Sequence, residues 1–297
     1  YMEKGWTRTV GEAKAMRAKV KQTGRVMQLG HQGRQYAAAI QARELIGQGY
    51  IGPVTLVTTG RCGNTPPERA TWRWYGYYSA WERPDEAQVV KDLDWERVRG
   101  PGRKRAFCMA RFWHWRCYGD YGTGVAGDLL SHELDYVQSV LGYGIPDRCS
   151  TLGGIHFLED GREIPDTAST TYEFEKQKCT VTFTSSMNSA LPLTPEFRGK
   201  YGTIRFNRIG QDANDFEVIG ERNAGRHAGG VIRKFDPAAT PAQPSHMQDF
   251  LNCVRERRKP KCNEDEAFVE AVTFIMPARA YREQRVVRWD AGREEIV

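Results

Sequence analysis

The 297-residue sequence contains no apolar run that approaches the ~20 residues required by a membrane-spanning helix. It also contains no internal repeat and no low-complexity tract. Hydrophobic residues make up 40% of the chain and charged residues 27%, which is typical of a soluble globular protein and not of a disordered one. The length suits one large domain or two ordinary ones, and it allows a substantial core.

Cysteine and histidine motifs are absent as well. Seven cysteines are scattered along the chain without a C-x-x-C pair, which argues against a disulfide framework and against a structural zinc site. The six histidines form neither His-x-x-x-His nor His-Glu-x-x-His, so we expect no metal site. Free thiols favour a reducing compartment, and we expect a cytoplasmic protein. A periplasmic one is the alternative if an export signal precedes Tyr1.

A large excess of one charge is also missing, since the net charge is only +6. The densest basic stretch runs from Arg97 to Arg116, with seven Arg or Lys and no acidic residue. Such a run is compatible with phosphate or nucleic acid, but no nucleic-acid-binding motif accompanies it. We therefore expect a solvated surface or a basic loop beside an anionic cofactor, and no nucleic-acid partner.

The first part of the sequence has the alternation of a doubly wound sheet. Thr9-x-x-Glu12 is a capping box, in which two side chains satisfy the first free amides of a helix. Apolar residues recur at helical spacing up to Gly24, and residues 26–29 then predict a short buried strand. Helix, glycine, strand and glycine in this order predict that residues 1–33 are the C-terminal remnant of a Rossmann domain.

Residues 34–297 predict a second domain of the α+β class. Short β-rich segments follow one another with brief connections, which favours a large, open and mostly antiparallel sheet flanked by helices. The segment at 61–121 is rich in tryptophan and arginine, and loops this long are usually functional. We expect strands at 54–59, 151–157, 170–174, 179–184 and 202–207, and helices at 34–48, 122–141, 246–257 and 263–281.

The residues from Gly122 to His132 form the most informative motif. Its glycines allow a tight turn and a close approach of the backbone to a ligand. Asp128 and His132 are four residues apart, so on a helix they lie one turn apart on the same face. A carboxylate near an imidazole raises its proton affinity, which would let His132 accept a proton from a substrate hydroxyl. The alternative is a structural histidine that is hydrogen-bonded beside Asp128.

A second candidate is Glu3-Lys4-Gly5, at the end of a short strand and just before a helix. Open α/β sheets bind ligands at such turns, beyond the carboxyl ends of their strands. A lysine at this place can donate to a substrate oxygen or to an anionic group. The alternative for Glu3 and Lys4 is an ordinary solvated pair.

Together these segments resemble the family of glucose–fructose oxidoreductase, inositol dehydrogenase and rhizopine oxidoreductase. Residues 1–5 are similar to the family's strand and Glu-Lys-Pro turn, and residues 26–34 to its last Rossmann strand and the arginine beyond it. Residues 122–135 are similar to its glycine-rich Asp-x-x-x-His motif. The resemblance covers essentially the whole chain. Further similarity to the glucose–fructose oxidoreductase subgroup lies at 94–101, 112–115, 160–166 and 249–255.

The resemblance implies an NAD- or NADP-dependent oxidoreductase that transfers a hydride between the nicotinamide and a sugar, polyol or sugar derivative. It implies that His132 is the general acid/base on the reacting hydroxyl and that Lys4 hydrogen-bonds the same oxygen. Asp128 would orient the substrate or the histidine. These three residues are the catalytic set that the resemblance assigns.

Binding roles also follow from the resemblance. Glu3, Lys4 and Arg34 would contact the cofactor, whereas Trp113 and His114, together with Asp128, would contact the carbohydrate. The family pairs its open sheets, so we expect a homo-oligomer that associates through the sheet.

The sequence departs from the family pattern in two places. The proline after Glu-Lys is Gly5 here, which changes backbone freedom more than chemistry, so Lys4 is still expected to serve. No G-x-G-x-x-G fingerprint follows a predicted strand, and roughly ninety residues that carry it in the family are missing. We therefore expect a fragment of a longer enzyme or a protein that has lost dinucleotide binding. The alternatives are a cofactor-less binding or scaffold protein, and a glycoside-cleaving enzyme that uses transient oxidation.

Overall fold

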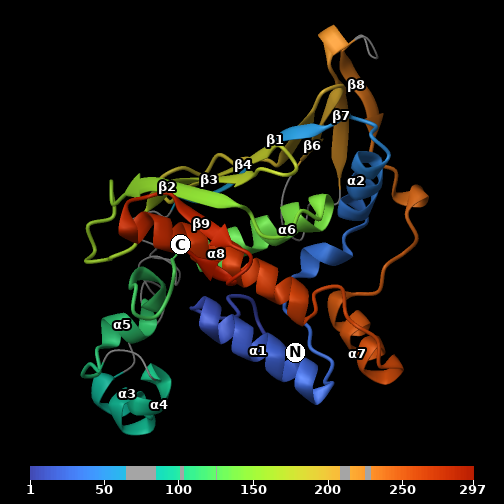
Figure 1. The fold of residues 1–297 in the computed structure, drawn as a ribbon. Coiled ribbons are helices and arrows are strands. Elements are labelled where there is room, and N and C mark those ends of the chain that lie inside the picture. The colour runs from blue at the N-terminus through green and yellow to red at the C-terminus, as the bar shows by residue number, and fades with distance from the viewer. Residues whose placement is uncertain (65–84, 101–103, 125, 208–214, 225–228) are drawn as a thin grey trace.

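The computed structural model describes residues 1–64, 85–100, 104–124, 126–207, 215–224 and 229–297. Its centre is a ten-stranded sheet with the order β10-β9-β2-β3-β4-β1-β5-β6-β7-β8 (Figure 1). The α+β class expected from the sequence is confirmed. The strands are β1 (Val54–Cys62), β2 (Arg148–Gly154), β3 (Thr167–Phe174), β4 (Cys179–Ser186), β5 (Glu196–Gly199), β6 (Gly202–Phe206), β7 (Phe216–Gly220), β8 (Gly230–Lys234), β9 (Val287–Asp290) and β10 (Glu295–Ile296).

Neighbouring strands of this sheet are antiparallel, apart from the parallel pair β1 and β4 at its middle. β4 shows the period of two that one covered face produces. Cys179, Val181 and Phe183 are buried, and the threonines between them are partly exposed. The buried side chains point toward the helices, which explains why the sequence pattern predicted this strand.

The longer helices lie on one side of the sheet (Figure 1). α6 and α8 lie against the strands, and α1 packs against α8. Tyr172 of β3 donates from its hydroxyl to the carbonyl oxygen of Thr273 in α8 at 3.1 Å, which fixes the sheet to this helix. The helices are α1 (Val10–Thr23), α2 (Ala37–Gly47), α3 (Glu86–Asp92), α4 (Trp95–Arg99), α5 (Met109–Trp113), α6 (Ser131–Leu141), α7 (His246–Glu256) and α8 (Glu264–Glu283).

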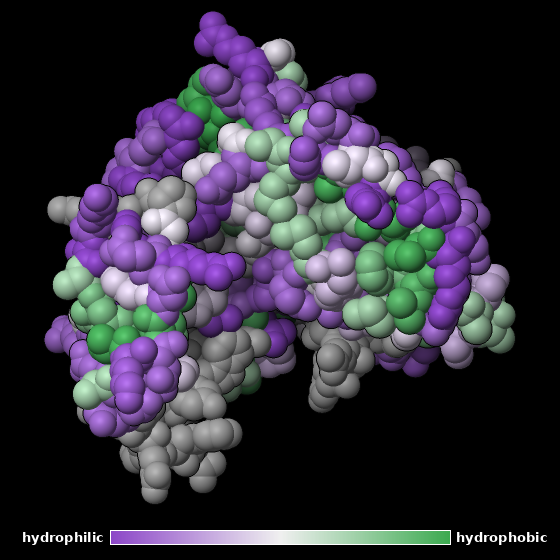
Figure 2. Space-filling model, turned by 90° about the horizontal axis from the view of Figure 1, so that it is seen from below, coloured by the Kyte–Doolittle hydropathy of each residue, from purple (hydrophilic) through white to green (hydrophobic). Residues whose placement is uncertain are grey.

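The helix side is mostly hydrophilic on its surface, and hydrophobic residues form separate clusters on it (Figure 2). None of the helices in the described part of the chain is both long and apolar enough to span a membrane. All seven cysteines carry free thiols. Disulfides therefore make no contribution to the core, which depends on packing between the sheet and α6 and α8.

The N-terminal segment carries the helix start that the sequence predicts. Thr9 Oγ1 accepts from the amide of Glu12 at 3.1 Å, and the Glu12 carboxylate accepts from the amide of Thr9 at 3.0 Å. Gly24 ends α1 in the left-handed region, at φ 61°. The strand predicted at 26–29 is wrong in extent. Only Leu29 forms a bridge, parallel to Met2, and the Leu29 amide donates on its other side to the carbonyl oxygen of Cys262.

Several other boundaries differ from the sequence prediction. The helix predicted at 34–48 begins at Ala37, because the 3-10 turn η1 (Gln32–Gln35) precedes it. Strands β5, β7, β8, β9 and β10 were not predicted. They have five residues or fewer, which is too short for a clear alternation of buried and exposed residues. The predicted 61–121 segment contains α3, α4 and α5, and its part at 65–84 lies outside the described residues.

Candidate active site

Two segments end at the same edge of the N-terminal part of the molecule. Met2 and Leu29 form a parallel bridge, so Lys4 and His31, which follow them, leave the bridge in the same direction. Ligands of open α/β sheets bind beyond the carboxyl ends of parallel strands. We therefore expect a ligand-binding or catalytic site at this edge, where both segments meet α6.

The glycine-rich segment is packed against its own neighbours. Gly124 has φ 61°, and a Cβ there would collide with the side chain of Ile164. A Cβ on Gly127 would collide with Thr123. With Gly122, these glycines have the spacing G-x-G-x-x-G, but they follow the 3-10 turn η3 (Trp115–Cys117) instead of a strand. They serve tight packing and not a dinucleotide loop.

Asp128 lies directly after this segment, in the π-helical turn η4 (Ala126–Leu130) that leads into α6. Its side chain is 3% exposed and forms an ion pair with Nζ of Lys4. Nε of Arg116 lies 3.2 Å from the other carboxylate oxygen. A buried carboxylate is costly unless cations and hydrogen bonds compensate it, and two cations do so here. Turns of this type are frequent at functional sites.

His132 lies in the first turn of α6, mostly buried. Its Nδ1 lies 3.2 Å from Nδ1 of His31. Burial, together with the nearby charges of His31 and Lys4, lowers the pKa of His132 to about 3, although Asp135 and Asp128 oppose the shift. The rise in proton affinity expected from Asp128 is therefore outweighed. His132 is therefore neutral at physiological pH and keeps one ring nitrogen with a lone pair. A neutral imidazole of this kind is a proton acceptor.

Lys4 and His132 meet at one place in the structure. Lys4 forms an ion pair with Asp128, which precedes His132 by four residues, and its charge is close enough to depress the pKa of the imidazole. The three residues proposed from sequence thus lie together, with Asp128 bound to Lys4 and Arg116. The participation of Arg116 was missed, because an arginine twelve residues upstream carries no spacing signal.

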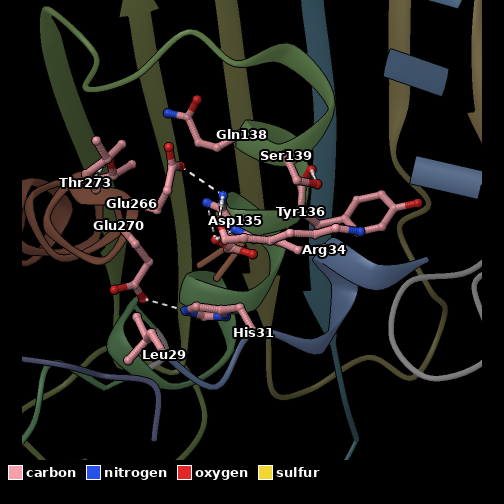
Figure 3. A network of polar contacts seen from close by, with 12 residues as sticks. Leu29, His31, Arg34, Asp135, Tyr136, Gln138, Ser139, Glu266, Glu270 and Thr273 are labelled. Carbon is pink, nitrogen blue, oxygen red and sulfur yellow. Dashed lines mark hydrogen bonds and ion pairs between the residues drawn. The ribbon is translucent and has the colours of Figure 1, made fainter. Parts of the chain in front are cut away.

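A second polar network contains His31, Glu270 and Arg34 (Figure 3), and His31 connects it to His132. His31 is fully buried, and its Nε2 lies 3.1 Å from Oε1 of Glu270, a buried residue of α8. Sequence reasoning missed both residues. Glu270 stands on a helix face of apolar residues, and a carboxylate in such a position was the available signal.

Arg34 belongs to the same network. Its guanidinium donates from Nε to Asp135 at 2.7 Å, and from Nη1 to Glu266 at 2.8 Å and to the carbonyl oxygen of Lys261 at 3.2 Å (Figure 3). These contacts tie η1 to α6 and α8. Arg34 thus has a structural role that the sequence did not suggest, and its predicted contact with a cofactor stays a prediction.

Trp113 and His114 lie at the end of α5. Trp113 packs edge-on against Phe112 with ring centroids 5.2 Å apart, and the His114 amide donates to the carbonyl oxygen of Ala110 at 2.8 Å. These contacts show how the short helix is held. The predicted contacts of Trp113 and His114 with a carbohydrate stay predictions.

A cavity of about 260 Å³ lies between the sheet, α8 and the glycine-rich segment. Thr123, Leu130, Phe183, Ser185 and Tyr281 are among its lining residues. In the described chain, the candidate catalytic side chains do not line it. The glycine-rich segment is therefore shared between this cavity and the cluster around Asp128.

The basic run seen in the sequence is largely neutralised by carboxylates. Arg105 lies 2.6 Å from Asp120, and Arg111 lies 2.7 Å from Glu163. Arg99 and Arg116 are likewise paired, with Glu96 and Asp128. These arginines thus support the fold of the segment. Within the described residues, no group of three or more His, Cys, Asp or Glu side chains has the arrangement of a metal site.

The half-covered ten-stranded sheet and its glycine-rich Asp-x-x-x-His segment define an α/β domain of an oxidoreductase. A family model described as "Oxidoreductase family, C-terminal alpha/beta domain" matches residues 102–288, which is more than half of the chain. The chain belongs to this family, the glucose–fructose oxidoreductase, inositol dehydrogenase and rhizopine oxidoreductase family. The resemblance inferred from sequence is confirmed.

Solved structures share the fold. An aldose-aldose oxidoreductase from Caulobacter crescentus, complexed with glycerol, is 18% identical with a TM-score of 0.66, over 97% of this chain and 71% of that chain. A levoglucosan dehydrogenase in complex with NADH is 16% identical with a TM-score of 0.67, over 97% and 72%. The WlbA dehydrogenase from Bordetella pertussis, in complex with NADH and UDP-GlcNAcA, is 16% identical with a TM-score of 0.64, over 97% and 70%. No curated protein sequence matches the chain.

Proposed function

We propose that this chain carries the catalytic and substrate-binding groups of an NAD(P)-dependent oxidoreductase that acts on a sugar, a polyol or a sugar derivative. Membership of the oxidoreductase family supports the reaction class. The observation that carries the proposal is the convergence of Lys4, Asp128 and His132 at the carboxyl edge of the bridged N-terminal segments. The carbohydrate class is supported by the ligands named for structural neighbours, namely glycerol, levoglucosan and L-sorbose.

In this proposal each residue acts on the reacting hydroxyl group. His132 accepts the hydroxyl proton, because its low pKa keeps it neutral. Lys4 donates a hydrogen bond to the same oxygen, and Asp128 holds the ammonium group in place. The bound nicotinamide would supply the acceptor for the hydride.

The described residues fit only one end of a dinucleotide. Glu3 and Lys4 lie beyond the bridged segment, where open α/β sheets hold the reactive end of a cofactor. The glycines at 122–127 do not provide a pyrophosphate loop, since side chains of Thr123 and Ile164 occupy the space beside them. We assign Glu3 and Lys4 to the nicotinamide end and assign no residue of this chain to the pyrophosphate.

Replacement of His132 by alanine tests the function. We expect kcat to fall ~100-fold or more with NAD or NADP and a panel of sugars and polyols, because a general base normally contributes that much. His156→Ala is the matched control, since His156 is exposed and lies in a loop after β2. Unchanged turnover in His132→Ala would refute the acid/base role. A protein that binds carbohydrate without any turnover would favour the scaffold alternative.

A further inference from the structure

Two buried side chains, those of His31 and Glu270, continue a line that starts at the partly buried His132 of the proposed reaction site. His132 and His31 approach each other through their Nδ1 atoms at 3.2 Å, and Nε2 of His31 lies 3.1 Å from Oε1 of Glu270. His132 belongs to α6, His31 follows Leu29, and Glu270 belongs to α8. Figure 3 shows the contact between His31 and Glu270. The side chains of His31 and Glu270 are each 1% exposed. Water therefore does not compete for the contact between His31 and Glu270.

The ion pair between His31 and Glu270 and the contact between the two imidazoles select the proton positions along this line. An ionised carboxylate carries no proton, so the ion pair with Glu270 places a proton on Nε2 of His31. Neutral His31 then presents a lone pair at Nδ1, and His132 donates its Nδ1 proton to it. This arrangement leaves Nε2 of His132 with a lone pair. The buried pair thus selects the tautomer of His132 that can act as a base.

The charges around His31 favour a proton on it. Burial by itself disfavours the imidazolium, but Asp135 and Glu270 outweigh burial, and the pKa of His31 is raised in spite of Arg34. The pKa of Glu270 is raised by burial, and the contact with His31 opposes this effect. The other titratable groups that face the line are His246 of α7, Cys262 before α8 and Lys4 beside His132.

We propose that His31 and Glu270 form a buried proton relay behind His132, with His31 as a positioning residue and Glu270 as its counter-charge. The relay rests on the proposed function of His132. His132 would accept the hydroxyl proton at Nε2, while a bound nicotinamide would supply the acceptor for the hydride of the same carbon. The Nδ1 proton of His132 moves to Nδ1 of His31, and the imidazolium of His31 stays paired with the carboxylate of Glu270.

The relay compensates for the low basicity of His132. Its low pKa makes it a weak base, since its own imidazolium would lie in a buried place near the ammonium of Lys4. Transfer to His31 moves the positive charge away from Lys4 and next to a buried carboxylate. The reverse reaction uses the same path, and His132 then returns the proton to the alkoxide oxygen.

Nitrogen NMR of the imidazole rings tests the geometry without any cofactor. In the full chain we expect His132 to carry its proton on Nδ1, whereas free histidine prefers Nε2. His31→Phe removes the acceptor with a ring of similar shape, and we expect His132 to revert to the Nε2 form. A proton on Nε2 of His132 in the unmodified chain would overturn the relay.

Glu270→Gln tests the counter-charge and is nearly isosteric, so folding is preserved even if His31→Phe fails to fold. We expect the pKa of His31, followed by the same NMR signals, to fall by about one unit or more, because the imidazolium loses its buried partner. Glu266→Gln is the matched control, one turn away on the same helix, paired with Arg34 and half-exposed. An unchanged pKa of His31 in Glu270→Gln would overturn the relay.

Kinetics separate the relay from the proposed function. Protonated His31 cannot take a proton, so kcat/KM should fall as the pH drops through the raised pKa of His31. Glu270→Gln should move this acid limb to lower pH and reduce kcat about tenfold, with little change in KM. If His132→Ala loses turnover but the pH dependence of kcat/KM is unchanged in Glu270→Gln, the relay is rejected and the proposed function stands. An active His132→Ala rejects both.

Discussion

Gly5 determines how Lys4 reaches its partner. Its φ of 75° lies in the left-handed region, and the turn brings it against the carbonyl oxygen of Gly127, 3.5 Å from where a Cβ would stand. Proline fixes φ near −65°, so the proline of the family motif could not adopt this backbone. Gly5 therefore gives this chain a turn that differs from the one in the family motif. Lys4 still forms an ion pair with Asp128.

Substitution of Gly5 tests this turn. We expect Gly5→Ala to lower the free energy of unfolding by roughly 1–2 kcal/mol, the cost of a Cβ in the left-handed region. Gly5→Pro should cost more and should weaken activity as well, because Lys4 is displaced. Gly47→Ala is the control, since nothing lies within 4 Å of its Cβ position and its φ is not positive. Urea unfolding of the three variants measures the effect, and a proline variant as stable as the original would contradict it.

At the scale of the element, α1 begins directly after Thr9, the N-cap residue that the sequence predicts. The capping box of Thr9 and Glu12 satisfies its first amides, and its packed face brings Arg17 over the ring of Phe268 at 3.7 Å. Arg17 also lies 2.7 Å from Glu294. A helix of the N-terminal segment is thereby fixed to α8 and to the C-terminal end, so loosening its first turn weakens a contact between the two ends of the chain.

Thr9→Ala should therefore destabilise the protein by about 1 kcal/mol, the usual cost of losing a side-chain cap. Thr23→Ala is a matched control in the last turn of the same helix, where the exposed side chain donates to the carbonyl oxygens of Lys19 and Val20 and caps no free amide. Thermal or urea unfolding should separate the two variants. Equal stability would mean that the cap contributes nothing to the folded state.

The elements that could be predicted from sequence are those with a local signal. Thr9 and Glu12 mark a helix start, and the alternation from Cys179 marks β4. β8 and β10 have no such signal, because they are short edge strands: β8 is mostly exposed and β10 has only two residues. The same division holds at the site. Asp128 and His132 share one short motif, whereas the contacts of His132 with His31 and of His31 with Glu270 span about a hundred residues or more, and only folding brings them together.

At the scale of the whole molecule, the helices leave one face of the sheet uncovered in the described structure (Figure 1). The middle of that face carries threonines, with Thr171 of β3 directly opposite Thr182 of β4. A sheet with one open face favours a second layer, and two copies of the same sheet can provide it. We expect the protein to associate through this face.

Sedimentation measures the association directly. We expect the unmodified protein to sediment as a dimer or larger assembly. Thr182→Arg should shift it to the monomer, because a symmetric interface would bring two buried like charges together. Lys178→Ala in the turn between β3 and β4 lies outside the face and should leave the assembly unchanged. A monomer at all concentrations in the unmodified protein would contradict a sheet-mediated oligomer.

The parallel pairing of β1 with β4 has a consequence for how the chain reaches its native state. Leu56 pairs with Thr180, so the centre of the sheet closes only across more than a hundred intervening residues. β2, β3 and β4 are joined as neighbours in sequence and can form a meander first. We therefore expect β1, which is synthesised early, to join the sheet only after β4 has formed, and we expect this long-range pairing to be slow.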